Sequence, residues 1–157
     1  MVRGRSAREL TVTELRDIAV RYLTRREHGI EELTQKLIQR GADRANAEKV
    51  VADLAEENLV SDQRFTEMFV RTRMQQLNGP VKIRAELRGL GIADHLITQA
   101  MPDDRDAWFD IAHKWAGKRR HGELDYAGRA KIYRGLMNRG FTHDQANVAL
   151  DRLNSPD

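Results

Sequence analysis

The side chains best suited to chemistry in this sequence are five histidines and a scatter of carboxylates. Cysteine is absent, so thiolate metal sites, cysteine nucleophiles and disulfides are excluded. No histidine has a partner at metal-binding spacing, and the HExxH pattern is missing. The histidines are His28, His95, His113, His121 and His143. We expect no catalytic residue and no metal site, and we interpret His113 as a packed or half-exposed side chain.

Two short motifs resemble pieces of known sites. Gly89-Leu90-Gly91 looks like a fragment of a dinucleotide-binding loop, but it should follow a helix, where glycine serves as a helix stop. Glu56 and Glu57 could act as paired carboxylates, but they end an acidic helix and are better interpreted as a solvated face. The sequence therefore predicts neither an enzyme nor a cofactor.

Charged residues gather in blocks along the chain. Residues 43–62 hold six acids and two bases, whereas residues 64–90 carry a net charge of +4 and residues 114–134 a net charge of +5. The net charge of the whole chain, +3, hides this alternation. Basic blocks favour a phosphate backbone or an acidic protein surface as partner, and a solvated face that serves solubility is the alternative.

These basic blocks predict a partner surface. Lys82, Arg84 and Arg88 should lie on one short helix, which a tight Gly-Pro turn separates from Arg73, so the two groups should lie close together. Exposed charges contribute little to folding, so stability does not require their clustering. The predicted partner-binding and DNA-binding residues are Arg64, Arg71, Arg73, Lys82, Arg84, Arg88, Lys118, Arg119 and Arg120.

Two tryptophans could stack on bases. Trp108 and Trp115 stand seven residues apart, which places them on one face of a helix. Core packing is the better interpretation, and a base-stacking platform is the alternative.

A repeat of about fifty residues indicates the elements that hold these side chains. A leucine, three residues and a glycine occur three times, and the motifs end at Gly41, Gly91 and Gly140, which are 50 and 49 residues apart. Glycine is the usual residue where a helix ends in a left-handed turn, so we predict a positive φ at all three. Apolar residues follow each glycine at helical spacing. Each copy therefore contains a helix, a glycine stop and a second helix.

A third amphipathic helix precedes each pair. Thr11 with Glu14 predicts a capping box for the first helix, and Thr142 with Gln145 caps the last. The predicted helices are residues 12–27, 30–40, 44–57, 62–77, 80–90, 93–101, 104–119, 126–139 and 143–153.

The predicted fold is all-α, with three tandem three-helix repeats that form an elongated, curved array. No stretch alternates with period two for long enough to form a strand. A single unit of this size buries little apolar surface, so neighbouring units should pack on one another. The predicted repeats are residues 11–60, 61–102 and 103–154, with flexible termini at 1–10 and 155–157.

The composition agrees with a helical protein that has much solvated surface. Charged residues make up 32% of the chain and aromatic residues only 6%. No apolar run approaches the roughly 18 residues that span a membrane, and no apolar segment follows the basic N-terminus as in a secretory signal. We expect a cytoplasmic protein that does not contact a membrane.

From about Leu15 to Leu153 the sequence resembles the RecX family, whose members modulate the RecA recombinase. The first-repeat signature is matched by Arg25-Arg26-Glu27-His28, Glu32-Leu33, Lys36-Leu37 and Gly41. The second is matched by Leu59-Val60-Ser61-Asp62-Gln63-Arg64-Phe65, Phe69-Val70, Arg73, Gly79-Pro80, Ile83, Glu86-Leu87 and Gly91-Ile92. The family usually has Gly-Tyr-Leu-Asp-Asp before the Arg-Phe pair, and residues 58–62 depart from that pattern.

This resemblance implies a fold of three tandem three-helix repeats and a role in recombination, DNA repair and the SOS response. Such proteins bind the RecA filament on single-stranded DNA, lie along its groove and inhibit its ATPase, strand-exchange and coprotease activities. It also implies no catalytic residue and no cofactor, with weak, non-specific affinity for single-stranded or double-stranded DNA. We expect a monomer.

A helix-turn-helix transcription factor is the competing interpretation. The leucine–glycine–helix step could be such a turn, and the basic blocks would suit phosphates. The helices after the three glycines are apolar-striped, however, and the first is acidic, as expected of core helices rather than recognition helices. A DNA footprint, compared with filament binding, would separate these two functions.

Overall fold

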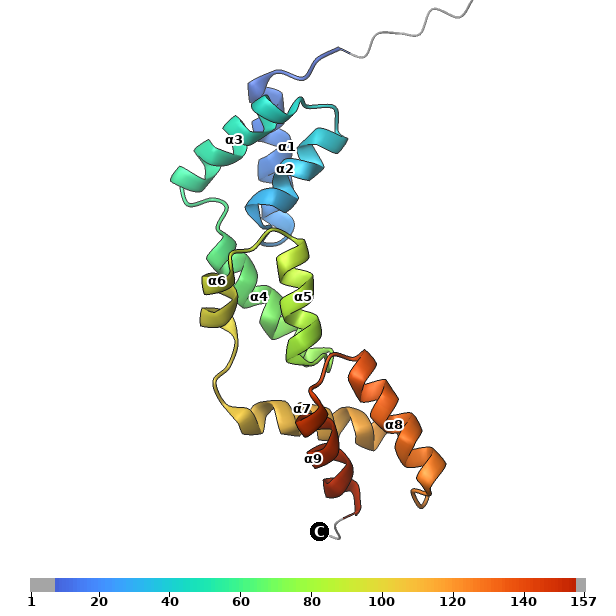
Figure 1. Cartoon of the computed structure of the whole chain (residues 1–157). Helices are drawn as coiled ribbons and strands as arrows, with labels where there is room; N and C mark the ends of the chain where they lie inside the picture. Colours follow the sequence, from blue (N-terminus) through green and yellow to red (C-terminus); the bar gives the residue numbers. More distant parts are fainter. Residues whose placement is uncertain (1–7, 155–157) are drawn as a thin grey trace, which may run out of the picture. The chain divides into compact units, whose positions relative to one another are not determined.

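Nine α-helices follow one another along residues 8–154, the part of the chain that the computed structural model describes (Figure 1). They are α1 (Val12–Arg25), α2 (Ile30–Gln39), α3 (Arg44–Glu56), α4 (Asp62–Gln75), α5 (Pro80–Gly89), α6 (Asp94–Ala100), α7 (Arg105–Arg119), α8 (Tyr126–Asn138) and α9 (His143–Asn154). Every helix bound lies within two residues of the predicted one. No strand occurs among the described residues, so the all-α fold is confirmed. Of the predicted flexible termini, residues 1–7 and 155–157 lie outside the described residues, and the elongation and curvature of the array stay predictions.

The leucine–glycine motif ends a helix in each repeat. Gly41, Gly91 and Gly140 have φ angles of 106°, 79° and 89°, which confirms the predicted left-handed turns. The residue after each glycine donates its backbone N–H to the carbonyl of the motif leucine, at 3.1 Å in all three repeats. This bond satisfies a carbonyl that the helix end would leave without a partner. The spacing from leucine to glycine in the motif therefore matches the hydrogen-bonded turn that ends each helix.

Two helix starts carry the predicted side-chain caps. The hydroxyl of Thr11 accepts a hydrogen bond from the backbone N–H of Glu14 at 3.1 Å. At α9 the bonds are reciprocal, because Gln145 N–H donates to the Thr142 hydroxyl at 3.1 Å and Thr142 N–H donates to the Gln145 side-chain oxygen at 2.9 Å. Both capping predictions are confirmed.

The chain divides into two compact units, and the boundary falls inside α4, between Phe65 and Thr66. The first unit holds α1, α2, α3 and the first turn of α4. Its core is a cluster of apolar side chains that are at most 9% exposed. The cluster consists of Leu15, Ala19, Leu33, Leu37, Ala42, Ala47, Val50, Val51, Leu54 and Val60. Full burial of one leucine is worth about 1.5–3 kcal/mol, so this cluster is the main source of stability in the first unit.

The second unit holds the rest of α4 and helices α5 to α9. Trp108 and Trp115 are only 5% and 8% exposed, which confirms that α7 packs both rings into the protein. A core cluster of the third repeat contains Trp115 and also Leu77, from the turn between α4 and α5. The second and third repeats therefore share buried apolar surface.

Candidate partner-binding surface

The start of α5 lies beside a polar pocket of about 360 Å³. Gly79 is the N-cap and Pro80 the first helical residue, where a missing N–H costs no hydrogen bond. The pocket is lined by Arg73, Gln76, Asn78, Lys82, Glu86 and Arg139. The predicted proximity of Arg73 to the start of α5 is confirmed, because Arg73 and Lys82 line the same pocket.

Arg73 is held by the second repeat itself. Its Nε donates to a carboxylate oxygen of Glu86 at 2.8 Å, and its Nη1 donates to the side-chain oxygen of Gln76 at 3.1 Å. The guanidinium also lies over the ring of Phe69, 4.4 Å from the ring centroid. Glu86 thus offsets the charge of Arg73, and this ion pair connects α4 to α5.

Arg139 is a pocket residue that sequence reasoning missed. It follows α8, and its Nε donates to the carbonyl oxygen of Leu77 at 3.3 Å, while its Nη2 donates to the carbonyl oxygen of Gln76. These carbonyls lie at the C-terminal end of α4, where a positive charge is favourable. The only sequence signal was its position before the motif glycine Gly140, which local patterning could not connect with α4.

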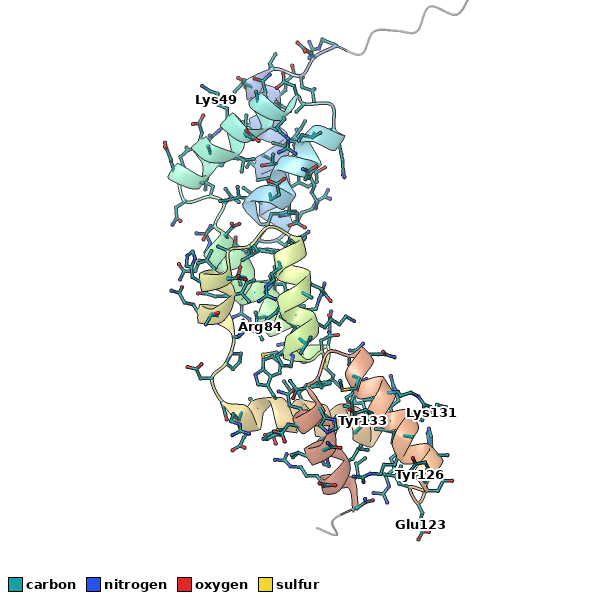
Figure 2. All side chains as sticks on the ribbon, viewed as in Figure 1. Lys49, Arg84, Glu123, Tyr126, Lys131 and Tyr133 are labelled. Carbon is teal, nitrogen blue, oxygen red and sulfur yellow. The ribbon has the colours of Figure 1, made fainter. Side chains whose placement is uncertain are left out.

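Of the predicted cations on α5, Lys82 and Arg84 are the two that are not paired with a carboxylate of the described residues. Both are half-buried, and within residues 8–154 neither forms an ion pair. Figure 2 labels Arg84 on α5. Arg88, at the far end of α5, pairs with Asp94 at 2.9 Å, and both side chains are exposed. An exposed pair of this kind contributes about 0–1 kcal/mol and opens readily toward a partner.

Arg71 faces a different hollow from the other predicted residues of repeat two. It is exposed on α4 and lines a shallow pocket of about 450 Å³ together with Glu67, Gln99 and Pro102.

Arg64 belongs to the first unit and has a structural role there. Its Nε donates to Glu27 at 2.9 Å, and its two terminal nitrogens donate to the side-chain and backbone oxygens of Asn58, at 3.0 Å and 2.8 Å. Asn58 has a φ of 61°, a conformation that asparagine tolerates better than most residues. Arg64 therefore fixes the turn before α4, and its charge is shared with Glu27.

The predicted cations at the end of α7 have unequal freedom. Arg119 lies over the Trp115 ring, 4.9 Å from its centroid, while Arg120 donates to the carbonyl oxygens of Gly122 and Leu153. Lys118 is exposed on the last turn of the helix. In Figure 1 this turn lies well apart from the end of α5 that carries Arg88, so the predicted residues do not form one tight cluster.

The first-repeat signature forms a polar cluster around a buried histidine. His28 is 1% exposed, and its Nδ1 donates to the backbone oxygen of Arg26 at 3.0 Å. Its Nε2 lies 3.0 Å from the ammonium nitrogen of Lys36. Because a carbonyl only accepts and an ammonium only donates, these contacts require the neutral imidazole with its proton on Nδ1.

Burial and charge shift the pKa values of this cluster. Burial lowers the pKa of His28, and the positive charges of Arg26 and Lys36 lower it further, against the hydrogen bond to the Arg26 carbonyl. Burial alone would raise the pKa of Glu32, but the hydrogen bond and charge of Arg26 outweigh it, so this pKa is lowered. The same bond raises the pKa of Arg26. The cluster is therefore built around one neutral histidine and one ion pair.

Within residues 8–154, no three histidine or carboxylate side chains are arranged to hold a metal ion. In the same residues, no helix combines the length and apolar character needed to cross a membrane.

Comparison with known proteins places all three repeats in one family. Residues 16–54, 61–101 and 106–150 match the family models described as the first, second and third three-helix domains of RecX. A regulatory protein RecX from Halorhodospira halophila is 42% identical over 138 residues, covering 86% of this chain and 85% of that protein. One from Legionella pneumophila is 36% identical over 146 residues, covering 92% of this chain and 97% of that protein.

The fold is also that of a solved structure. The crystal structure of RecX from Lactobacillus salivarius superposes with a TM-score of 0.78 at 22% identity, covering 91% of this chain and 96% of that one. The chain belongs to the RecX family of regulatory proteins.

Proposed function

We propose that this RecX-family chain binds the RecA filament on single-stranded DNA and mainly inhibits its ATPase, strand-exchange and coprotease activities. The observation that carries the proposal is the match of all three repeats to the three domains of one regulatory family. The chain acts by binding, as a cytoplasmic monomer, without a cofactor and without catalysing a reaction. Its contact with DNA outside the filament is weak and non-specific.

The basic face of α5 is the proposed contact surface for the filament. Arg73 and Arg64 are held by internal carboxylates, whereas Lys82 and Arg84 form no ion pair with a described residue. A partner can therefore use these two charges without first breaking an internal bridge. Arg88 joins them when its exposed pair with Asp94 opens.

Charges of this kind act mainly on encounter. A nucleoprotein filament carries many phosphates, and complementary charge raises the rate of association and makes binding sensitive to salt. Lys82 and Arg84 form no ion pair with a described residue, so reversing their charges breaks no salt bridge that holds the fold. Binding and folding can thus be tested separately.

The decisive experiment titrates the protein into RecA assembled on single-stranded DNA and follows ATP hydrolysis. The double variant Lys82→Glu with Arg84→Glu should raise the half-inhibitory concentration at least about tenfold at physiological salt, because two attractive charges become repulsive. Its thermal midpoint should stay close to that of the wild type.

A control with the same change of charge is available in the first unit. Lys49→Glu with Arg21→Glu alters two exposed cations on α3 and α1 and should inhibit like the wild type. If the wild type does not inhibit ATP hydrolysis, the proposed function is wrong. If the Lys82 and Arg84 variant inhibits as well as the wild type, the contact surface lies elsewhere.

A further inference from the structure

An uncovered strip of aromatic and apolar side chains runs along α8. Tyr126 is 90% exposed and Met137 is 41% exposed. Between them lie Ala130 and Tyr133, both half-buried. The spacing of four, three and four residues places all four on one helical face. Figure 2 shows Tyr126 and Tyr133 coming from the same helix.

The strip opens into a shallow pocket of about 310 Å³ between α8 and α9. Its lining combines two tyrosine rings with two arginines and a small apolar floor. The lining residues are Tyr126, Arg129, Ala130, Tyr133, Arg134, Asn147 and Leu150. No carboxylate lines this pocket, so its charge is positive.

One ring of the strip is fixed and the other is uncovered. The hydroxyl of Tyr133 lies 2.6 Å from Nδ1 of His143, and Nε2 of that histidine lies 2.8 Å from the side-chain nitrogen of Asn147. These bonds hold the Tyr133 ring at the mouth of the pocket. Tyr126, at the start of α8, has almost its entire side chain in solvent.

The flanking arginines also differ. Arg129 pairs with Asp151 at 2.8 Å, whereas Arg134 is exposed and forms no ion pair within residues 8–154. Arg134 is therefore free to meet an anion beside the two rings.

Folding explains only part of the strip. The buried residues of α8, Ile132 and Leu136, join the core of the third repeat, and Tyr133 packs against that core with one side of its ring, whereas Tyr126 and Met137 stay exposed. Leaving a tyrosine ring in water gains none of the free energy of burial, about 25 cal/mol per Å² of apolar surface. An aromatic strip with cationic flanks is therefore better explained by a partner.

We propose that this strip binds single-stranded nucleic acid, with bases stacked on Tyr126 and Tyr133 and a phosphate held by Arg134. Aromatic faces beside cations suit this ligand, because every base has a π-face and every linkage carries a negative charge. Seven residues of helix rise about 10 Å, so the rings offer two separate stacking positions. A duplex keeps its bases stacked inside and would leave Tyr126 uncovered.

This inference rests on the proposed function in one respect, namely that the target contains single-stranded DNA. It assigns the third repeat a role in stacking on bases, separate from the charge-driven contact proposed for α5. The two proposals can fail independently, because the strip is tested with an oligonucleotide alone and α5 is tested by inhibition of RecA.

The test is fluorescence anisotropy of a labelled thymidine 20-mer titrated with the full chain in the absence of RecA. Tyr126→Ala should raise Kd at least about fivefold, the effect expected when one stacked base is lost. Tyr126→Phe should stay within about twofold of the wild type, because the ring remains. Arg134→Ala should reduce the slope of log K against log salt by about 0.7, the loss of one phosphate contact.

Two matched controls complete the design. Leu59→Ala removes another exposed apolar side chain, and Lys49→Ala another exposed cation, both in the first unit, and neither should change Kd. A wild type that binds a duplex as tightly as the 20-mer, or fails to bind the 20-mer, would overturn the proposal. Equal binding by Tyr126→Ala would do the same. If a glutamate-rich peptide binds more tightly than the 20-mer in a Tyr126-dependent way, the strip is a protein-docking surface instead.

Discussion

Helices α2 and α5 occupy the same place in their repeats, yet their first turns are completed by different groups. Gly29 and Gly79 are the N-caps of these helices, and both lack a side chain that could cap. Each helix therefore needs partners from elsewhere for its first N–H groups. The first repeat uses side chains for this purpose, and the second uses backbone.

At α2 the partner is a carboxylate. The N–H of Ile30 donates to the side chain of Asp62, on α4, at 2.7 Å. The buried His28 and the Arg64–Glu27 pair lie in the adjoining turns. Ionisable groups thus surround this helix start.

At α5 the partners are carbonyls of the turn between α8 and α9. Pro80 replaces the residue that would need a partner, so no N–H is present there. The N–H of Gly79 donates to the oxygen of Arg139 at 2.8 Å, and that of Val81 donates to the oxygen of Gly140 at 2.9 Å. A Cβ on Gly79 would overlap the backbone of Gly140. This contact exists because neither glycine has a side chain.

The two helix starts are sensitive to different perturbations. The contribution of a carboxylate or a histidine to the stability of a helix start depends on its charge. It therefore changes with pH, salt and conservative substitution. Two backbones in contact are sensitive to side-chain volume, because a single added methyl group would force them apart. Sequence changes that are tolerated at α2 should therefore be severe at α5.

The largest effect should come from Gly140→Ala. A methyl group there would lie 2.5 Å from the backbone nitrogen of Lys82 and would also strain a φ of 89°. We expect a loss of about 2–5 kcal/mol in unfolding free energy, since strain costs about 1–2 kcal/mol and overlap about 1–3 kcal/mol. Urea unfolding followed by tryptophan fluorescence measures it, because both tryptophans lie in α7 of the same unit.

Gly41→Ala is the matched control for that loss. It has a similar φ, 106°, but a methyl group there would meet nothing within 4 Å. Strain alone should cost about 1–2 kcal/mol, measured by circular dichroism. Equal losses at the two glycines would show that the packing of Gly140 on Lys82 has no energetic weight.

A medium effect should follow Asp62→Ala, about 1 kcal/mol, because the Ile30 N–H loses its acceptor. Ile30→Pro removes that N–H, just as Pro80 leaves no N–H at the first residue of α5. Gly29 has φ −76° and ψ 158°, which a following proline accepts. In the Ile30→Pro background, Asp62→Ala should therefore cost clearly less, as a double-mutant cycle would show. An unchanged cost would mean that Asp62 acts through its other contacts.

The smallest effect should be a pH dependence confined to the first unit. The pKa of His28 is lowered by burial, so the unfolded chain binds the extra proton first. The contribution of His28 is complete above about pH 6.5, the ordinary pKa of imidazole, and is lost as the pH falls. Glu32, with its lowered pKa, adds a further loss only below about pH 4.5.

Hydrogen exchange of α2 between pH 7.5 and 5.5, corrected for the intrinsic rate, measures this effect. Protection should decrease as the pH is lowered in the wild type, and much less so in His28→Asn. Asparagine is the residue that the second repeat has at this position, Asn78. His95→Gln, at an exposed histidine, is the control and should behave like the wild type. Identical pH profiles for wild type and His28→Asn would show that His28 does not govern the first unit.

Local patterning predicted the helices and their ends but not what their ends touch. The Leu-x-x-x-Gly spacing was enough to predict positive φ at Gly140, because the turn involves only neighbouring residues. That Gly140 packs on Lys82, or that Arg139 binds the carbonyl of Leu77, depends on residues about 60 positions apart. No periodicity carries that information.

The candidate site was predicted less completely than the fold. Basic blocks identified Lys82 and Arg84 correctly as cations on one helix, but net charge could not distinguish them from Arg73, which Glu86 holds. The sequence does not single out Tyr126, which is 90% exposed, because an aromatic residue is more often buried than exposed. Which cations are already paired, and which rings are uncovered, are properties of packing.

The contact between Gly79 and Gly140 also orders events during synthesis. Leu77 and Arg139 are 62 residues apart, so the start of α5 leaves the ribosome long before its carbonyl partners do. At about 5–20 residues per second the interval is roughly 3–12 s. Throughout that time the nascent second repeat exposes Leu77 and lacks the turn that completes α5. A chain that stalls in the third repeat would therefore present this unfinished surface to chaperones and proteases.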